Sequence, residues 1–441
     1  MTHDGWTSCS TESYNTTTIH YINKDWDLKT ATLNTKKMDG SHTAERLAES
    51  ILETKSEWCL KEVVATTDNA ANEVKAFKLL QWTRFGCFGH RINLIVKKAL
   101  EQPDISRVLG KGRRLVTLYH SSSSINDYLK EKQQLLLSSM LVGHKLIADV
   151  PRRWNSSLMM LTRLNEQMPA LLAVAADDRV NKSAKSTMKN CLYSFEESST
   201  VEKVIELLQP FKTATEIMCS EKIPTISKVL PTVMKLKKMV VIKEDDPPII
   251  RTIKTELFKQ LELRTETEEI SLLGTILNPF TKGFEFLPEK KTEAENILRR
   301  LASGVKVVIK KEKNDDDHHD EFDNTDAPPL PNLPSNLLDQ EPDLPLVSST
   351  SDAAETYSIS DEKPDSEDTE TSPKKRKVVK SKDTEDWLSD IVCMGVSSAN
   401  KEDAVQAEIS RYLGTSLRDC DTNHTLLEWW KKMKYFFQDS Q

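Results

Sequence analysis

The segment VVATTDNAAN, residues 63–72, decides the fold class of the N-terminal part of the chain. Val63 to Thr67 is a short run of apolar and β-branched residues, which is typical of a buried strand. This run ends at Asp68, and Glu73 to Leu80 then has the pattern of a helix. The segment therefore predicts a strand that ends at a carboxylate and leads into a helix.

The residues on either side of this segment continue the alternation of strands and helices. Tyr14 to Ile22 and Leu28 to Leu33 are rich in Thr, β-branched and aromatic residues and predict two strands. Ser41 to Trp58 predicts an amphipathic helix, with Ser41 as its N-cap. Phe85 to Phe88 predicts a further strand that runs into a helix over Ile92 to Leu100. Together these segments predict a mixed α/β sheet.

Helical periodicity dominates the next part of the chain. Apolar residues recur there at three- and four-residue spacing in five segments. These segments are Ile125 to Met140, Ser156 to Ala176, Val201 to Ser220, Thr225 to Val240 and Ile249 to Leu263. We therefore expect an all-helical domain over residues 106–304, after a sheet domain over residues 1–105.

The last third of the chain contains a segment of a different character. Residues 305–384 are acidic and rich in Pro and Ser, so their burial cannot offset the entropy lost on ordering. We predict a disordered linker there. Helical patterns return over residues 385–441, in Val405 to Leu413 and Leu426 to Phe437, and predict a small tail that packs back on the body.

The composition restricts the kinds of protein that this chain can be. A formal net charge of -7 argues against a uniformly basic surface, so any surface that binds nucleic acid must be local. No run of about 18 apolar residues occurs, and we expect no membrane-spanning helix. The seven cysteines are scattered and never form a CxxC pair, which indicates reduced thiols of the cytosol or nucleus, and we expect no disulfides.

Several short motifs follow one another in a fixed order along the chain. They are DGWTS at 4–8, TDNAAN at 67–72, GCFGHRINL at 86–94, DVPRRWNSS at 149–157, EKIPTIS at 221–227 and LEWWK at 427–431. In this order and at these distances they resemble the hAT superfamily of DNA transposases, and in particular its domesticated forms, the zinc-finger BED-domain-containing proteins. The resemblance covers nearly everything except roughly residues 305–385.

The resemblance implies an RNase H-like mixed sheet interrupted by a helical insertion domain. Active members of the superfamily cut DNA with three acidic residues that hold two divalent metal ions, because hard cations such as Mg²⁺ prefer oxygen ligands. By motif, Asp4 matches the first acid and Asp68 the second. From the residues alone, we favour ordinary carboxylates that cap turns at strand ends, whereas the order of the family motifs favours a shared position in an old active site.

The third acid of the superfamily is a glutamate in a Ser-Glu-Arg motif beyond the Trp-Trp region. This sequence reaches Trp429 and Trp430 and stops at Gln441 without that motif. We therefore expect the chain not to be an enzyme and to need no cofactor, with Mg²⁺ bound only if the pair of Asp4 and Asp68 still holds a metal. No upstream BED finger is present and the dimerisation segment is short, so we expect sequence-specific DNA recognition and dimerisation to be weakened.

Two groups of residues are candidates for contact with DNA. By resemblance, Arg153 and Trp154 approach the DNA end and help to expose a base near the cut. The local alternative is a helix start at this point, with Trp154 packing inward.

The second group is the basic cluster of Lys111, Arg113 and Arg114, together with Arg107, which could meet phosphates. A charged loop facing solvent explains this cluster equally well.

Two histidine patterns have metal-ligand spacing or clustering. Cys87 and His90 are spaced as CxxH, but structural zinc requires four ligands, so we favour buried packing with the histidine hydrogen-bonded beside the sheet. His318 and His319 lie in an acidic run, where we expect them to be solvated.

Two signals in the predicted linker concern the cell nucleus. Consecutive cations resemble a monopartite nuclear localisation signal that an import receptor binds, although such a run could also balance neighbouring acids. This signal consists of Pro373, Lys374, Lys375, Arg376, Lys377 and Val378. Lys310 lies in an apolar-Lys-x-acid pattern targeted by SUMO conjugation, a pattern that also arises by chance.

The sequence therefore predicts a catalytically inactive, domesticated hAT transposase-like protein of the nucleus. We expect it to associate with DNA or chromatin as a transcriptional regulator, and to form a homodimer or a heterodimer with related proteins. Two alternatives stay open: an active or decaying DNA transposase, and a protein-binding scaffold that does not contact DNA.

Overall fold

The computed structural model describes residues 1–303, 404–415 and 425–438, apart from residues 9, 39, 62, 137–140, 142 and 151. The predicted linker at 305–384 lies outside the described residues, and so do the signals at Lys310 and at Pro373 to Val378 and the pair His318 and His319.

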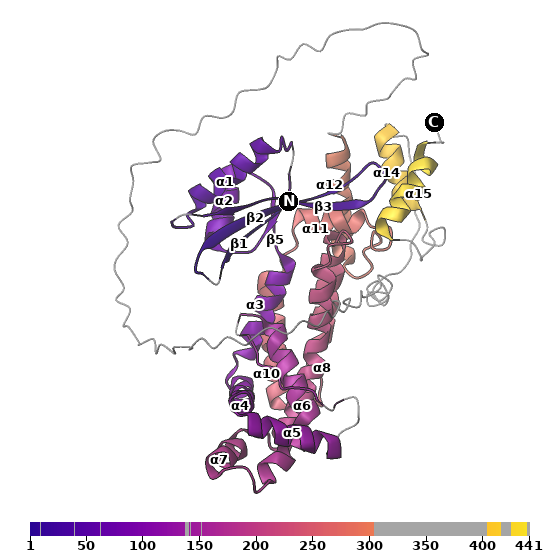
Figure 1. The fold of residues 1–441 in the computed structure, drawn as a ribbon. Coiled ribbons are helices and arrows are strands. Elements are labelled where there is room, and N and C mark those ends of the chain that lie inside the picture. Colours follow the sequence, from indigo (N-terminus) through magenta and orange to yellow (C-terminus); the bar gives the residue numbers. More distant parts are fainter. Residues whose placement is uncertain are drawn as a thin grey trace, which may run out of the picture. The chain divides into compact units, whose positions relative to one another are not determined.

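Five strands form one mixed sheet in the order β3-β2-β1-β4-β5 (Figure 1). The first three pair antiparallel, and β4 is parallel to both β1 and β5. Their bounds are β1 (Thr2–Thr7), β2 (Ser13–Ile22), β3 (Leu28–Lys37), β4 (Ala65–Thr67) and β5 (Arg84–Gly86). The predicted mixed α/β sheet is thereby confirmed. Several boundaries were wrong: β3 extends beyond Leu33 to Lys37, β4 begins at Ala65 instead of Val63, and Phe88 begins a helix instead of ending β5.

Two helices pack against each other and against this sheet. They are α1 (Ala44–Glu57) and α2 (Ala71–Leu80). Ile51 and Phe77 from these helices are buried with Ala65 of β4, so they provide the apolar contact between the helices and the sheet. The predicted N-cap Ser41 was wrong by two residues, because Thr43 occupies that position and accepts a hydrogen bond from the backbone of Arg46.

Ten further α-helices and two short 3-10 helices follow in residues 88–303 of the described chain. They are α3 (Phe88–Leu100), α4 (Pro103–His120), α5 (Ser123–Leu136), α6 (Trp154–Ala176), α7 (Lys182–Cys191), α8 (Phe195–Met218), η1 (Ile226–Lys228), α9 (Val229–Met239), α10 (Pro248–Arg264), α11 (Glu269–Ile276), η2 (Pro288–Lys290) and α12 (Lys291–Ser303). The predicted combination of an α/β sheet with a helical region is confirmed.

Four of these helices, α4, α7, α11 and α12, were not among the predicted segments. The loop interpretation of the basic cluster was wrong, because Lys111, Arg113 and Arg114 all lie within α4. Charged residues dominate the outer side of α4, but Ile105 and Leu115 are buried on its inner side. The many charged residues of its outer side are the reason that the apolar spacing of this amphipathic helix was not recognised in the sequence.

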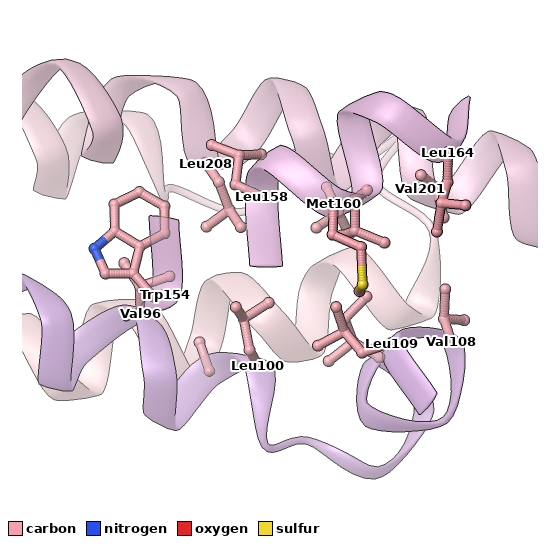
Figure 2. Close-up of a cluster of buried hydrophobic side chains, with 14 of the residues drawn as sticks. Val96, Leu100, Val108, Leu109, Trp154, Leu158, Met160, Leu164, Val201 and Leu208 are labelled. Carbon is pink, nitrogen blue, oxygen red and sulfur yellow. The ribbon is translucent and has the colours of Figure 1, made fainter. Parts of the chain in front are cut away.

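The largest hydrophobic cluster lies among these helices. Figure 2 shows Val96 and Leu100 of α3 facing Trp154 and Leu158 of α6, with Leu208 of α8 beside them. All five side chains are buried. The sheet is joined to this core by α3, which follows β5 in the chain and contributes buried residues such as Val96 and Leu100.

Two C-terminal helices pack on the region around α11. They are α14 (Ala404–Gly414) and α15 (Leu426–Gln438). Tyr412 donates a hydrogen bond to the carbonyl oxygen of Ile276 at 2.8 Å, and the Trp430 indole donates one to the carbonyl oxygen of Leu277 at 3.1 Å. Trp430 also stacks on Trp26 from the turn between β2 and β3. The C-terminal helices therefore contact both the sheet and the helical region.

Candidate functional site

Two aspartates lie near each other where the short strand β4 ends beside β1. In the pairing of β1 with β4, His3 lies opposite Thr67. Asp4 follows His3 within β1 and Asp68 directly follows the last residue of β4, so the register brings them together. The sequence predicted both residues as members of an old active site, and the sheet places them as neighbours.

The electrostatics of Asp4 reflect this neighbour. Partial removal from water raises the pKa of Asp4 above its usual range, and repulsion from the Asp68 carboxylate raises it further. His3 and His90 act in the opposite direction on the same pKa. Asp68 itself accepts a hydrogen bond from the backbone of Ala70 at 3.0 Å, at the start of α2. The Asp68 carboxylate is thus partly engaged in shaping the turn into α2.

This pKa shift predicts how stability depends on pH. Because the pKa of Asp4 is raised by folding, the folded chain binds more protons than the unfolded chain, and stability falls as the pH rises from 3.8 through the raised value. We expect Asp4→Asn to raise the free energy of unfolding at pH 7 by less than about 1 kcal/mol, because the side chain is exposed. The Tm should rise slightly as a result. The gain should vanish below pH 3.8. Thermal unfolding between pH 3 and 8 measures this, with Asp25→Asn in the turn before β3 as the control. A lower Tm for Asp4→Asn at pH 7 would contradict the assignment.

A third carboxylate, Glu73, lies close to the aspartate pair, and the sequence motifs did not single it out. Glu73 is in the first turn of α2, and its charge also raises the pKa of Asp4, though less than Asp68 does. Its Oε1 is 3.0 Å from Nδ1 of His3, and the two side chains are only 7% and 1% exposed. The other carboxylate oxygen, Oε2, is buried without a hydrogen-bond partner among the described residues. The sequence held one signal for a polar contact near Asp4, namely the position of His3 directly before it in the same strand.

A cleft of about 250 Å³ opens beside these residues. Asp68 and Glu73 line it on one side, and Trp6 of β1 and His42, just before α1, line it as well. Trp6 is held in place by stacking on Tyr14 at 4.7 Å between ring centroids. The cleft therefore combines carboxylates with an aromatic wall at the end of the sheet.

The resemblance implies a two-metal centre at the carboxylates of Asp4 and Asp68. Such a centre uses several oxygen ligands that bridge and clamp two cations. Within residues 1–303, 404–415 and 425–438, no three His, Cys, Asp or Glu side chains are arranged to hold a metal ion. Glu73 lines the same cleft as Asp68, but its Oε1 lies 3.0 Å from Nδ1 of His3. The described residues therefore supply an acidic pair but do not fit a two-metal centre.

Cys87 and His90 lie next to this edge of the sheet. Cys87 precedes the first residue of α3, and its backbone N–H donates to the carbonyl oxygen of Thr67 at 2.6 Å. Both side chains are half-buried, and His90 has no hydrogen-bond partner among the residues that the structure describes. The expectation of a buried, hydrogen-bonded histidine was therefore wrong, because the start of α3 lies at the rim of the sheet and remains partly open to water.

The predicted DNA-contacting cations differ in whether their charges are paired. Lys111 lies 2.8 Å from a carboxylate oxygen of Glu197, and Arg113 lies 2.7 Å from one of Asp149. Arg114 is exposed and forms no ion pair within the described part of the chain. Arg107 also lies 3.4 Å from Glu197, so three of the four predicted cations of α4 have a carboxylate partner within the fold.

The motif around Trp154 is divided between the surface and the core. Arg153 is exposed and, among the residues that the structure describes, has no ion-pair partner. Trp154 begins α6 and is only 4% exposed, because its indole packs in the core shown in Figure 2. Of the two interpretations left open by the sequence, the inward packing of Trp154 is the arrangement in this structure.

No helix in the described ranges is both long enough and apolar enough to cross a membrane.

Comparison with known proteins agrees with this architecture. The ZBED1 RNase-like domain matches residues 2–84, and the ZBED1 RNase-like helical domain matches residues 85–207. The human zinc finger BED domain-containing protein 4 is 24% identical over 314 residues, which cover 67% of this chain and 26% of that protein. The boundary between the two matched domains falls within β5, directly before α3.

Two further relatives carry different names. A putative AC transposase of Zea mays is 28% identical over 195 residues, covering 40% of this chain and 24% of the relative. A putative transcriptional regulator, tpeD, of Talaromyces stipitatus is 24% identical over 361 residues, which cover 70% of this chain and 39% of that protein. The chain thus spans between about a quarter and two fifths of the length of these relatives. The RNase-like sheet, the adjoining helical domain and these relatives together support a hAT transposase-derived, BED-protein-like identity for the chain.

Proposed function

We propose that this chain is a catalytically inactive relative of the transposases that associates with DNA or chromatin in the nucleus and regulates transcription. The observation that carries the proposal is the buried pair of His3 and Glu73. This pair engages Glu73, the carboxylate whose charge, after that of Asp68, raises the pKa of Asp4. A carboxylate withdrawn from water and committed to a histidine is costly to redirect toward a cation.

The comparisons support the regulatory part of the proposal through the relatives' names. One relative is called a putative transcriptional regulator, and another is named for a zinc-finger BED domain. Nuclear residence rests on the cationic run at Pro373 to Val378, and modification by SUMO at Lys310 stays a prediction of the same kind.

Exposed cations provide the proposed contact with DNA. Arg114 on α4 and Arg153 before α6 are free to meet phosphates, whereas Lys111 is held by Glu197. Because the net charge of the chain is -7, such contacts must come from local groups. Binding should then depend on salt, since each neutralised phosphate releases condensed counterions.

We expect the full chain to bind a short DNA duplex with an affinity that falls between 50 and 200 mM salt, a range in which phosphate contacts weaken strongly. The double variant Arg114→Ala/Arg153→Ala should weaken binding and reduce the salt slope by about 2, roughly one for each lost phosphate contact. Fluorescence anisotropy measures both quantities.

The matched control is Lys111→Ala on the same helix, whose charge is already paired and whose loss should change the slope little. A DNA affinity that does not change with salt concentration, or no DNA binding at all, would favour a scaffold that works only through protein partners. Equal effects of the control and the double variant would show that paired and unpaired cations do not differ.

An active DNA transposase is the second candidate, and the adjacency of Asp4 and Asp68 favours it. If the chain cuts DNA, supercoiled plasmid incubated with Mg²⁺ should be nicked, and Asp4→Asn/Asp68→Asn should abolish the nicking. The inactive proposal expects no more nicking from the wild-type chain than from this double variant. Nicking that depends on both aspartates would overturn it.

A further inference from the structure

Two cysteines from distant parts of the sequence lie beside the same glycine. Cys87 joins β5 to α3, and Cys219 follows the last residue of α8. A Cβ atom placed on Gly89 would lie 3.1 Å from the sulfur of Cys219 and 3.9 Å from the sulfur of Cys87. The separation of the two sulfur atoms therefore cannot exceed the sum of these distances, and no side chain of Gly89 stands between them.

The surroundings of the two thiols agree with this proximity. The pKa of Cys219 is raised by partial burial and, second, by the nearby Cys87. The helices that carry the two residues, α3 and α8, also pack against each other. Both thiols are free, Cys219 is exposed and Cys87 is half-buried. An oxidant in solution can therefore reach at least one member of the pair.

We propose that Cys87 and Cys219 are a site of reversible oxidation, at which the two thiols form an intramolecular disulfide. The bond would require Cβ atoms about 3.8 Å apart, so forming it would bring the two sulfurs together from their present positions beside Gly89. The scattered, reduced cysteines predicted from the sequence are the starting state of this reaction.

The chemistry balances with a peroxide as the oxidant. The thiolate of one cysteine attacks hydrogen peroxide, the O–O bond breaks, and a sulfenic acid and water form after proton transfer. The second thiolate then attacks the sulfenic sulfur, and a second water leaves as the S–S bond forms. Two thiols are oxidised by two electrons, and one peroxide is reduced to two waters.

The location of the pair gives the crosslink a structural consequence. The backbone of Cys87 is bonded to Thr67, the residue directly before Asp68. A disulfide would therefore fasten the edge of the sheet that carries the acidic pair to the end of α8. It would also enclose residues 88–218 in one loop, and long closed loops restrict the unfolded chain most strongly.

The test treats the full chain with a small excess of hydrogen peroxide, blocks the remaining thiols with N-ethylmaleimide, and analyses a non-reduced digest by mass spectrometry. We expect a linked peptide containing Cys87 and Cys219 that disappears after treatment with dithiothreitol. The oxidised chain should also unfold at a Tm about 5 °C higher than the reduced chain, because the crosslink constrains the unfolded state.

Three variants make the result specific. Cys219→Ser should abolish the linked peptide and the rise in Tm, whereas Cys59→Ser, which removes an exposed thiol after α1, should leave both unchanged. Gly89→Ala keeps both thiols but inserts a methyl group 3.1 Å from the Cys219 sulfur, so it should slow crosslinking several-fold. Circular dichroism confirms that each variant is folded.

Oxidation of Cys59 in the wild-type chain without a linked peptide of Cys87 and Cys219 would overturn the proposal. A link from Cys219 to any other cysteine, or to a second copy of the chain, would overturn it equally.

Discussion

Trp154→Ala is expected to lower the free energy of unfolding by about 3–5 kcal/mol, the largest effect of any single change considered for this chain. The indole is buried against Val96, Leu100 and Leu158 in the core of Figure 2. Its removal forfeits the burial of a large aromatic surface and leaves a cavity that the surrounding helices can fill only in part. Chemical denaturation followed by circular dichroism measures the loss.

The control for this prediction is Trp6→Ala at the cleft beside Asp68. Trp6 is 43% exposed, so its replacement should cost far less, mainly the stacking on Tyr14. DNA binding distinguishes the two interpretations of the Arg153–Trp154 motif. If Trp154→Ala weakened DNA binding while the stability stayed within 1 kcal/mol of wild type, as for a surface substitution, the core assignment of Trp154 would be contradicted.

His3→Leu is expected to lower the free energy of unfolding by about 3 kcal/mol. The substitution leaves the Glu73 carboxylate buried with neither oxygen bonded to a described side chain, because Oε2 already lacks a partner. A buried carboxylate without compensation is costly in the low-dielectric interior. Thermal and urea unfolding at neutral pH measure the effect.

Two comparisons isolate the pair from simple loss of side-chain contacts. Lys75→Ala, on the same helix as Glu73, breaks an exposed ion pair with Glu45 and should cost less than about 1 kcal/mol. The double variant His3→Leu/Glu73→Leu removes both polar partners and should be more stable than His3→Leu alone. A single variant as stable as Lys75→Ala would show that the buried pair does not support the fold.

Short-range patterns in the sequence were sufficient for most of the fold. The apolar run ending at Asp68, the Thr-rich strands and the helical spacing of α6 and α8 each reflect which face of a local segment can be buried. The same patterns missed α4, because its outer face is crowded with charges. The two aspartates of the acidic pair were singled out by the resemblance of the motifs at 4–8 and 67–72, and not by these local patterns.

The relations between distant residues could not be predicted in this way. Glu73 and His3 are 70 positions apart, and Lys111 and Glu197 are 86 apart. Whether a charge is paired or free depends on which elements pack together. A local sequence pattern does not contain that information. This is why Lys111 and Arg114 looked alike in the sequence and differ in the structure.

The sequence by itself determined that a mixed sheet precedes a helical region, because periodicity acts over a few residues, whereas the two aspartates were singled out by the resemblance of their motifs. Only the tertiary structure decided that Trp154 packs inward, that Glu73 is bound to His3, and that Cys87 and Cys219 share one surface. Each of these depends on burial and on contacts between segments far apart in the chain, which form only when the helices close around their common core.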